Sequence, residues 1–295
     1  MKKNSLLISA LTLVSLFTGC HPQEKQTANE SPTLRFSAIP DQDTTAQKER
    51  YAPVVQWLTK TLGIQAEFVP ASDYAGSVDK FETGDIQLAW FGGVTGVQAR
   101  NAVAGSRAIV SGAKDLKFKS YFIANSATRL TPSETFPAGI KNLTFTFGSS
   151  GSTSGCIMPA YFILEKTGKA PLDFFSQKVG FSGAHDKTAQ QVQNGVYQTG
   201  VLNFSTYDRL VKEGKIDPAK CSVIWTTPTY ADYNFTAHAD LDKTFGAGFT
   251  DKLQAALIAC KDPAVLKAFD RNTFVKVNNA TFKGIEEVVK TVKLK

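Results

Sequence analysis

Histidine and cysteine are scarce in this chain of 295 residues, which has three of the former and four of the latter. The histidines are scattered along the sequence, so a multi-histidine metal site is not expected. No two cysteines have the CxxC spacing of zinc ribbons and thioredoxin-like redox sites. Beyond residue 20 only Cys156, Cys221 and Cys260 remain, which allow at most one disulfide bridge. We therefore predict no metal site and no cofactor.

Long apolar runs are also missing. The main one covers residues 6–17, which is shorter than the roughly 20 residues that a membrane-spanning helix needs. Lys2 and Lys3 precede this run, and small residues and Cys20 follow it, which is the pattern of a secretory signal peptide. We therefore expect residues 1–19 to be removed and the mature chain to have no transmembrane helix.

The small residues in front of Cys20 resemble the bacterial lipobox, in which the cysteine is acylated and becomes the new N-terminus. The alternative is an ordinary cleavage site with a chance cysteine. Residues 20–32 are polar and contain no aromatic residue, as expected of a solvated tether. Several acyl chains anchor a protein stably, whereas one binds only marginally. We predict a lipoprotein signal peptide over 1–19, lipidation at Cys20 and a lipid-anchored tether over 20–32, on the extracytoplasmic (periplasmic) side of a bacterial membrane.

The basic residues do not indicate nucleic-acid binding. The formal net charge is +7, and lysines gather near residues 114–119 and 290–295. No nucleic-acid motif accompanies them, so we interpret them as solvated faces. The modest basic excess is compatible with an anionic ligand but does not identify one.

Short apolar runs alternate with helical spacing along the rest of the chain, which predicts an α/β fold. The first set begins with LRFSAIP at 34–40, continues with a helical pattern over 46–62 and returns to AEFVPA at 66–71. A second set begins with LTFTFG at 143–148, after a stretch near 126–138 that contains proline and serine.

The two sets predict two lobes. About 275 residues remain after cleavage, which is near the size at which one hydrophobic core gives way to two. We assign residues 33–125 plus 231–295 to lobe 1 and residues 126–230 to lobe 2, with chain crossings near 121–127 and 226–234. This arrangement leaves a ligand cleft between the lobes, at the carboxyl ends of the strands, where open α/β sheets bind ligands.

Residues 148–155, GSSGSTSG, lie between an apolar strand and a segment with helical spacing. The free N–H groups at a helix start suit an oxyanion, and the hydroxyls of Ser152, Thr153 and Ser154 can donate to the same oxygens. The alternative is that Ser152 or Ser154 only caps the helix. Pro159 leaves the helix start open between residues 154 and 159.

Of two enzyme motifs considered for this segment, a P-loop is excluded and a nucleophile elbow is only weakly supported. A phosphate-binding P-loop needs Gly-x4-Gly-Lys-Ser/Thr, and residues 148–165 contain no lysine. A nucleophile elbow needs serine at the centre of G-x-S-x-G, but Thr153 is at the centre of residues 151–155. We therefore predict that the chain is not an enzyme, and keep a phosphoesterase only as a less favoured alternative.

His185 follows an apolar strand in the segment SGAHD. A neutral imidazole there could be structural, whereas a histidinium facing the cleft would give a strong charge-assisted bond to an anion. The residues alone leave both readings open.

Four segments together resemble the phosphonate-type periplasmic binding proteins of ABC transporters, which share the two-lobed type II fold with a mixed sheet flanked by helices in each lobe. These segments are residues 73–75 (DYA), 85–92 (DIQLAWFG), 152–155 (STSG) with Pro159, and 183–186 (GAHD). Finer stretches at 39–44, 88–100 and 230–238 resemble a branch described as selenate transporter components.

The resemblance implies eight ligand-binding residues: Tyr74, Trp90, Phe91, Ser152, Thr153, Ser154, His185 and Asp232. The Ser-Thr-Ser run and His185 hold the tetrahedral head group, while Tyr74 and the Trp90–Phe91 pair form the opposing wall. For Trp90 and Phe91 the alternative is plain strand core. Relatives that bind aminoalkylphosphonates have an acidic residue where this chain has Tyr207, which argues against an amino-bearing ligand.

The resemblance predicts a solute-binding lipoprotein of an ABC importer. It would capture a small tetrahedral oxyanion (phosphonate, phosphite, phosphate or a selenate-like anion) by lobe closure and deliver it to a membrane permease. We expect a monomer without nucleic-acid partners. The main alternative is an anion-sensing lipoprotein that feeds a signalling partner.

Overall fold

The computed structural model describes residues 31–42 and 47–292. Cys20 and the predicted signal peptide lie outside the described residues. Residues Pro32–Lys295 cluster as one unit. Within the described part of the chain, no helix combines the length and apolar character needed to cross a membrane.

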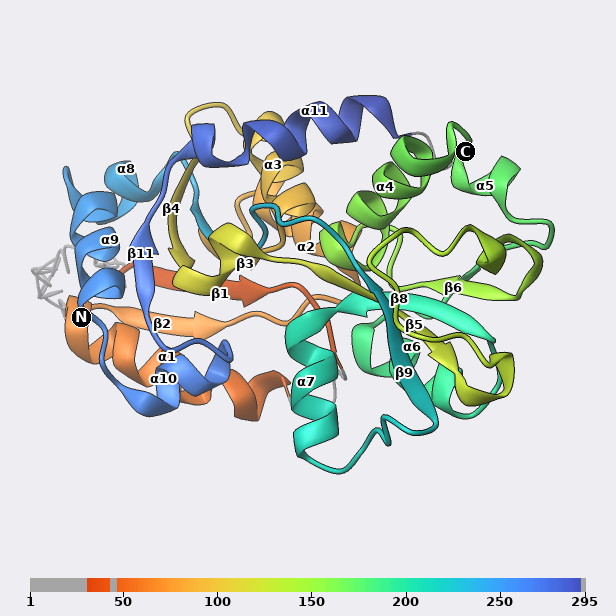
Figure 1. Ribbon diagram of the computed structural model, residues 1–295. Helices are drawn as coiled ribbons and strands as arrows, with labels where there is room; N and C mark the ends of the chain where they lie inside the picture. The colour runs from red at the N-terminus through yellow and green to blue at the C-terminus, as the bar shows by residue number, and fades with distance from the viewer. Residues whose placement is uncertain (1–30, 43–46, 293–295) are drawn as a thin grey trace, which may run out of the picture. The chain divides into compact units, whose positions relative to one another are not determined.

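Six strands form the first sheet, in which β1, β2 and β3 are parallel and β10 runs antiparallel to both β3 and β4 (Figure 1). Phe36 and Ala38 of β1 face Leu88 and Trp90 of β3 in the pairing register. The order of strands is β11 (Phe274–Lys276), β4 (Arg107–Gly112), β10 (Asn234–Ala237), β3 (Leu88–Phe91), β1 (Thr33–Ala38) and β2 (Gln65–Phe68).

Five strands form the second sheet, which is also mixed, because β6 is parallel to β7 and β8 whereas β5 is antiparallel to β8 and β9. The order of strands is β7 (Gly180–Phe181), β6 (Phe145–Phe147), β8 (Thr199–Asn203), β5 (Ser120–Asn125) and β9 (Cys221–Thr226). The two mixed sheets and their flanking helices confirm the predicted α/β architecture.

The helices connect the strands and cover the sheets. Those before β5 are α1 (Gln47–Leu62), α2 (Tyr74–Glu82) and α3 (Gly93–Ala102). Those between β6 and β9 are α4 (Met158–Thr167), α5 (Pro171–Phe174), α6 (His185–Gln193) and α7 (Phe204–Lys212). Those after β10 are α8 (Leu241–Phe245), α9 (Phe249–Ala259), α10 (Pro263–Ala268) and α11 (Lys283–Thr291).

Helix α1 shows why the periodicity of the sequence produces this packing. Tyr51, Val54, Leu58 and Leu62 recur every three or four residues and are all buried. The Tyr51 ring meets Phe36 of β1 edge-on, at 5.6 Å between ring centroids. Burial of each such side chain stabilises the fold by about 1.5–3 kcal/mol, so these contacts fix the helix on the sheet.

Two segments, 113–119 and 227–233, carry the chain between the sheets, and they bond to one another. Phe118 and Tyr230 exchange backbone hydrogen bonds of 2.9 Å in both directions. The predicted boundary after residue 125 assigns Ser120–Asn125 to lobe 1, whereas this strand pairs in the five-stranded sheet. A short 3₁₀ turn over Ala113–Lys117 separates it from β4, without a glycine or proline inside the turn to mark the change. The division into lobes stays a prediction.

Candidate functional site

The serine-rich segment after β6 enters α4 through an irregular turn. Ser152 caps this turn, because its hydroxyl oxygen accepts a hydrogen bond of 2.9 Å from the Gly155 N–H. Thr153–Ile157 forms one π-helical turn, and the α-helix proper begins at Met158. Pro159 therefore lies in the first turn of α4, where its missing N–H costs no intrahelical bond.

Thr153 contacts the first turn of α3, a helix that follows strand β3 of the six-stranded sheet. Its Oγ1 accepts a hydrogen bond of 2.9 Å from the Val94 N–H in the first turn of α3. Gly92 makes this approach possible, because a Cβ at that position would lie 3.0 Å from Thr153 Oγ1 and 3.3 Å from Asp232 Oδ1. The two helix starts are thereby brought against one another.

Asp232 lies beside this contact and is only 1% exposed. Its Oδ1 accepts a hydrogen bond of 2.9 Å from the Gly93 N–H, whereas its Oδ2 is buried without a partner. Burial raises the pKa of Asp232 to about 7, although the Gly93 N–H and the nearby hydroxyls of Thr153 and Ser154 act in the opposite direction. Neither hydroxyl has hydrogen-bond geometry to Oδ2, so this oxygen remains an unused acceptor.

His185 is the first residue of α6 and is 1% exposed. Its Nδ1 accepts a hydrogen bond of 3.3 Å from the Asn203 N–H, which assigns the ring proton to Nε2. Burial lowers the pKa of His185, so the ring is neutral. Nε2 is buried without a partner. The structure therefore has the neutral imidazole of the first alternative and not the histidinium of the second, and the Nε2–H of this ring is left without an acceptor.

Tyr74 begins α2, which Asp73 caps by accepting a 2.8 Å hydrogen bond from the Gly76 N–H. Its ring packs against the serine-rich segment, since a Cβ on Gly151 would lie 3.0 Å from the Tyr74 Cβ. Burial raises the pKa of the Tyr74 hydroxyl well above its usual range, while a hydrogen bond with Ser152 lowers it in part. Tyr74 therefore places a neutral hydroxyl group next to other predicted ligand-binding residues.

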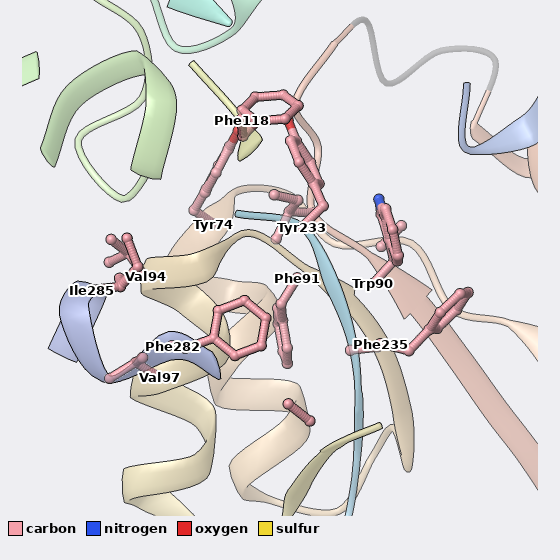
Figure 2. Close-up of a cluster of buried hydrophobic side chains, with 14 of the residues drawn as sticks. Tyr74, Trp90, Phe91, Val94, Val97, Phe118, Tyr233, Phe235, Phe282 and Ile285 are labelled. Atoms are coloured by element: carbon pink, nitrogen blue, oxygen red, sulfur yellow. The ribbon is translucent and has the colours of Figure 1, made fainter. Parts of the chain in front are cut away.

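Trp90 and Phe91 do not lie on the same side of β3, because successive strand residues point to opposite faces. Figure 2 shows their side chains extending in different directions. Phe91 packs edge-on against Phe81, with centroids 5.5 Å apart, which is the strand-core alternative. Trp90 stacks on Tyr233 at 5.7 Å and 21°, and lies next to Arg271.

Three residues near the site, Asp41, Asn203 and Tyr233, were not among the predicted ligand-binding residues. The Tyr233 hydroxyl donates to Asp41 Oδ2 at 2.9 Å and accepts from Asn203 Nδ2 at 3.3 Å. Asn203 also caps α7 by accepting a hydrogen bond from the Thr206 N–H. The signal available for Asn203 was its position as a cap residue after a strand, whereas nothing in the sequence pairs Asp41 with Tyr233.

The cationic side chain next to this group is already paired. Arg271 makes two hydrogen bonds of 2.6 Å with the buried carboxylate of Asp115, and its guanidinium lies over the Tyr233 ring at 5.0 Å. None of the eight predicted ligand-binding residues is lysine or arginine. The donors available to an anion at these residues are therefore hydroxyls, a neutral imidazole, the indole N–H of Trp90 and backbone N–H groups at helix starts.

Tyr207 and the three cysteines, which the sequence analysis also singled out, do not contribute to this group of residues. The Tyr207 hydroxyl donates to the Cys221 carbonyl oxygen at 2.5 Å, and this tyrosine packs in a separate cluster. In the described residues, Cys156, Cys221 and Cys260 are buried and unpaired. No group of three or more histidine, cysteine, aspartate or glutamate side chains in the described part of the chain could hold a metal ion.

The sequence matches known proteins over nearly its whole length. A family model described as ABC transporter, phosphonate, periplasmic substrate-binding protein matches residues 36–282. The probable ABC transporter phosphite binding protein PhnD1 of Prochlorococcus marinus (strain MIT 9301) is 33% identical over 289 residues, covering 96% of this chain and 95% of that protein. The phosphonates-binding periplasmic protein of Escherichia coli (strain K12) is 25% identical over 233 residues, covering 76% and 67%.

Solved structures agree with these matches. The structure of PhnD1 from Prochlorococcus marinus (MIT 9301) in complex with methylphosphonate has a TM-score of 0.82 at 35% identity, covering 88% of this chain and 97% of that chain. A binding protein component of an ABC phosphonate transporter from Pseudomonas aeruginosa has a TM-score of 0.75 at 21% identity, covering 88% and 86%. The fold is that of the type II periplasmic binding proteins, and the family consists of binding proteins, not enzymes. The chain belongs to the family of phosphonate periplasmic substrate-binding proteins of ABC transporters.

Proposed function

We propose that this protein binds a small tetrahedral oxyanion (a phosphonate, phosphite, phosphate or selenate-like anion) at the residues that meet around Thr153, and delivers it to an ABC permease. The observation that carries the proposal is the free donor of His185, which is buried and whose ring lies beside the Ser152 hydroxyl, since a Cβ on Gly155 would lie within 3.0 Å of both. The relatives support the choice of ligand, since one is named for phosphite and the solved structure of PhnD1 contains methylphosphonate.

A neutral site of this kind can bind an anion tightly. A dissociation constant between micromolar and nanomolar corresponds to about 8–12 kcal/mol. Hydrogen bonds to a charged group contribute roughly 1.5–3 kcal/mol each. Five or six such bonds, from Tyr74, Ser152, Thr153, Ser154, His185 and the helix start, therefore suffice after the ordering cost is subtracted.

The space on the Trp90 side of the site is nearly filled, which favours a small ligand on that side. A cavity of about 10 Å³ is lined there by Asp41, Trp90, Asn203 and Tyr233, among others. That volume is about one water molecule in size. An inorganic anion or a methylphosphonate fits this constraint better than a phosphonate with a long organic chain.

We expect anion binding to be coupled to a closing motion, which brings the helix N-termini next to the two sheets into contact. Several hydrogen bonds join elements of different sheets, among them those from Val94 N–H to Thr153 Oγ1 and from Arg209 to Gln42 Oε1 at 2.7 Å. An anion held by Ser152 and His185 would be covered by Tyr74 when these bonds form. Closure of this kind around a fixed ligand is the usual motion of periplasmic binding proteins.

We further propose that the protein is a lipoprotein, acylated at Cys20 and tethered by residues 20–32 on the periplasmic side of the membrane. The support is the lipobox-like sequence alone. Membrane fractionation of wild type and Cys20→Ala checks this proposal. The wild type should partition with membranes, and the variant should not.

Calorimetric titration of the chain without its predicted signal peptide tests the binding function. The panel is phosphate, phosphite, methylphosphonate, 2-aminoethylphosphonate, sulfate and selenate, each added to ligand-stripped protein. One-to-one binding of at least one anion, lost in His185→Ala, is the expected result. Absence of binding for all six anions would overturn the proposed oxyanion site.

A further inference from the structure

Two buried atoms in the proposed site lack hydrogen-bond partners, and they have opposite character. His185 Nε2 carries a proton and is a donor, because Nδ1 is occupied by the Asn203 N–H. Asp232 Oδ2 is an acceptor when the carboxyl group is ionised, while Oδ1 is occupied by the Gly93 N–H. Buried polar atoms in native proteins nearly always have a partner, so each of these two atoms needs one.

A tetrahedral anion without protons satisfies only the first of them. Its oxygens accept from His185 Nε2 and from hydroxyls, but they have nothing to donate to Asp232 Oδ2. Two acceptor oxygens facing each other in a dry site repel. An anion that carries one hydroxyl group satisfies both atoms, because its bare oxygens accept from His185 and its hydroxyl donates to Asp232.

We propose that Asp232 shares one proton with the bound anion, so that the site selects tetrahedral anions with a hydroxyl group, such as hydrogenphosphite or hydrogen methylphosphonate, over sulfate and selenate. This inference rests on the proposed function, because it requires an anion to lie next to Asp232. It narrows the ligand class and disfavours the selenate-like ligand that the finer sequence resemblance suggested.

The charges around Asp232 support a shared proton. The charged group that acts on it most strongly is Asp115, whose carboxylate is held by Arg271. The phenols of Tyr74, Tyr230 and Tyr233 also lie near Asp232, and burial raises the pKa of each well above its usual range, so they are neutral. His185 is neutral too, because burial lowers its pKa. A cation that acts on these groups, Arg271, is already paired with the Asp115 carboxylate through two hydrogen bonds of 2.6 Å.

Burial raises the pKa of Asp232 to about 7. Near neutral pH the shared proton can therefore come either from the Asp232 carboxyl group or from the anion. At higher pH the free site and the free ligand both lose their protons, and the complex must then recover one. Binding should therefore take up a proton from buffer. A site that bound a fully ionised anion beside an ionised Asp232 would take up none.

The test compares anion selectivity in the chain without its signal peptide, in wild type and Asp232→Asn. The asparagine has nearly the same shape, but its amide group can donate to an anion oxygen. At about pH 8, sulfate and selenate should bind wild type at least about 100-fold more weakly than phosphite or methylphosphonate, as expected when a site requires a ligand hydroxyl. In Asp232→Asn this ratio should fall by at least about tenfold, which is about 1.4 kcal/mol.

Asp73→Asn is the matched control, because it removes one carboxylate next to Tyr74 while asparagine can cap α2 equally well. It should keep the wild-type ratio. A second measurement does not depend on any variant: titration of wild type with phosphite at about pH 8.5, in two buffers of different ionisation enthalpy, should give uptake of about one proton per site.

Three results would overturn the inference: sulfate or selenate binding to wild type within tenfold of phosphite, an unchanged ratio in Asp232→Asn, or no proton uptake. Each of them is observed with a protein that still binds phosphite or methylphosphonate. Failure of wild type to bind any anion of the panel would instead overturn the proposed function. The two failures are therefore distinguishable.

Discussion

Thr153 Oγ1 and the Val94 N–H are hydrogen-bonded at 2.9 Å, although the two residues are 59 positions apart in the sequence. Thr153 follows a strand of the five-stranded sheet, and Val94 lies in the first turn of a helix that follows a strand of the six-stranded sheet. The bond therefore exists only while the two helix starts are in contact. A side chain that binds the anion would at the same time hold the two sheets' helices together.

Thr153→Ala should weaken anion binding at least about tenfold, or about 1.4 kcal/mol, because it removes a hydroxyl donor and the acceptor for Val94. The thermal unfolding midpoint should change little. Titration calorimetry with phosphite and a thermal melt measure the two effects. Thr83→Ala is a control, since its exposed hydroxyl only bonds to the Lys80 carbonyl oxygen. Equal affinities of wild type and Thr153→Ala would remove Thr153 from the site.

His185 should make the stability of the ligand-free protein depend on pH. Burial lowers the pKa of His185 below the ordinary value of 6.5, so the unfolded chain takes up a proton below about pH 6.5 while the folded chain does not. Acidification therefore favours unfolding, by at most about 1.4 kcal/mol per pH unit from this residue.

Urea unfolding at about pH 7 and about pH 5.5 checks this expectation. Wild type should lose more free energy of unfolding over this interval than His185→Ala. The other groups that titrate there contribute equally to both proteins, so the difference isolates His185. The same loss in both proteins would show that the ring is protonated in the folded state. Independently, His185→Ala should weaken anion binding at least about tenfold, through loss of the Nε2 donor.

Tyr74→Phe should weaken binding by about two- to tenfold, because it removes one hydroxyl from the site and keeps the ring that packs on Gly151. Burial keeps this hydroxyl neutral up to high pH, so the effect should be the same at about pH 7 and about pH 9. Tyr161→Phe on α4 is a suitable comparison, since Tyr161 packs beside Phe162 on that helix. A Tyr74→Phe protein with wild-type affinity would contradict the role of this hydroxyl.

Asp270 forms contacts between the elements of the two sheets and is not one of the eight predicted ligand-binding residues. Its carboxylate accepts from Lys114 Nζ at 2.8 Å and from the Ser205 hydroxyl at the start of α7. Asp270→Ala should lower anion affinity by up to about fivefold, the scale of a partly exposed ion pair, by weakening closure. Asp251→Ala, which breaks an exposed pair with Arg107, should not. Identical affinities in the two variants would exclude a closure effect.

The resemblance of the sequence to the family predicts that residues 148–155 and 183–186 lie close together, and the structure places them side by side. Both segments follow strands, and β6 and β7 pair in parallel through Thr146–Gly180 and Phe147–Phe181. The carboxyl ends of parallel neighbours emerge at the same edge of a sheet, so Ser152 and His185 meet. Their proximity is direct, because a Cβ on Gly155 would lie within 3.0 Å of both side chains.

Other parts of the site depend on where the chain changes sheets, which the local pattern does not reveal. Residues 107–125 contain two strands of similar apolar character on either side of the turn Ala113–Lys117, so the local pattern does not show where the chain changes sheets. The contact of Tyr233 with Asp41 spans 192 positions. The hydrogen bond between Tyr233 and Asp41 depends on the arrangement of the two sheets. Neither residue has a property of its own from which it could be predicted.

Asp232 lies on one of the two segments that join the sheets, and its backbone N–H donates to the Asp115 carbonyl oxygen on the other at 2.9 Å. Because these segments are bonded together, they cannot bend separately, and the sheets should turn about a single common axis. An anion bonded to Asp232 is therefore attached to the pivot itself. Gain or loss of one proton at that carboxyl group should change both how tightly the anion is held and how readily the protein opens to release it.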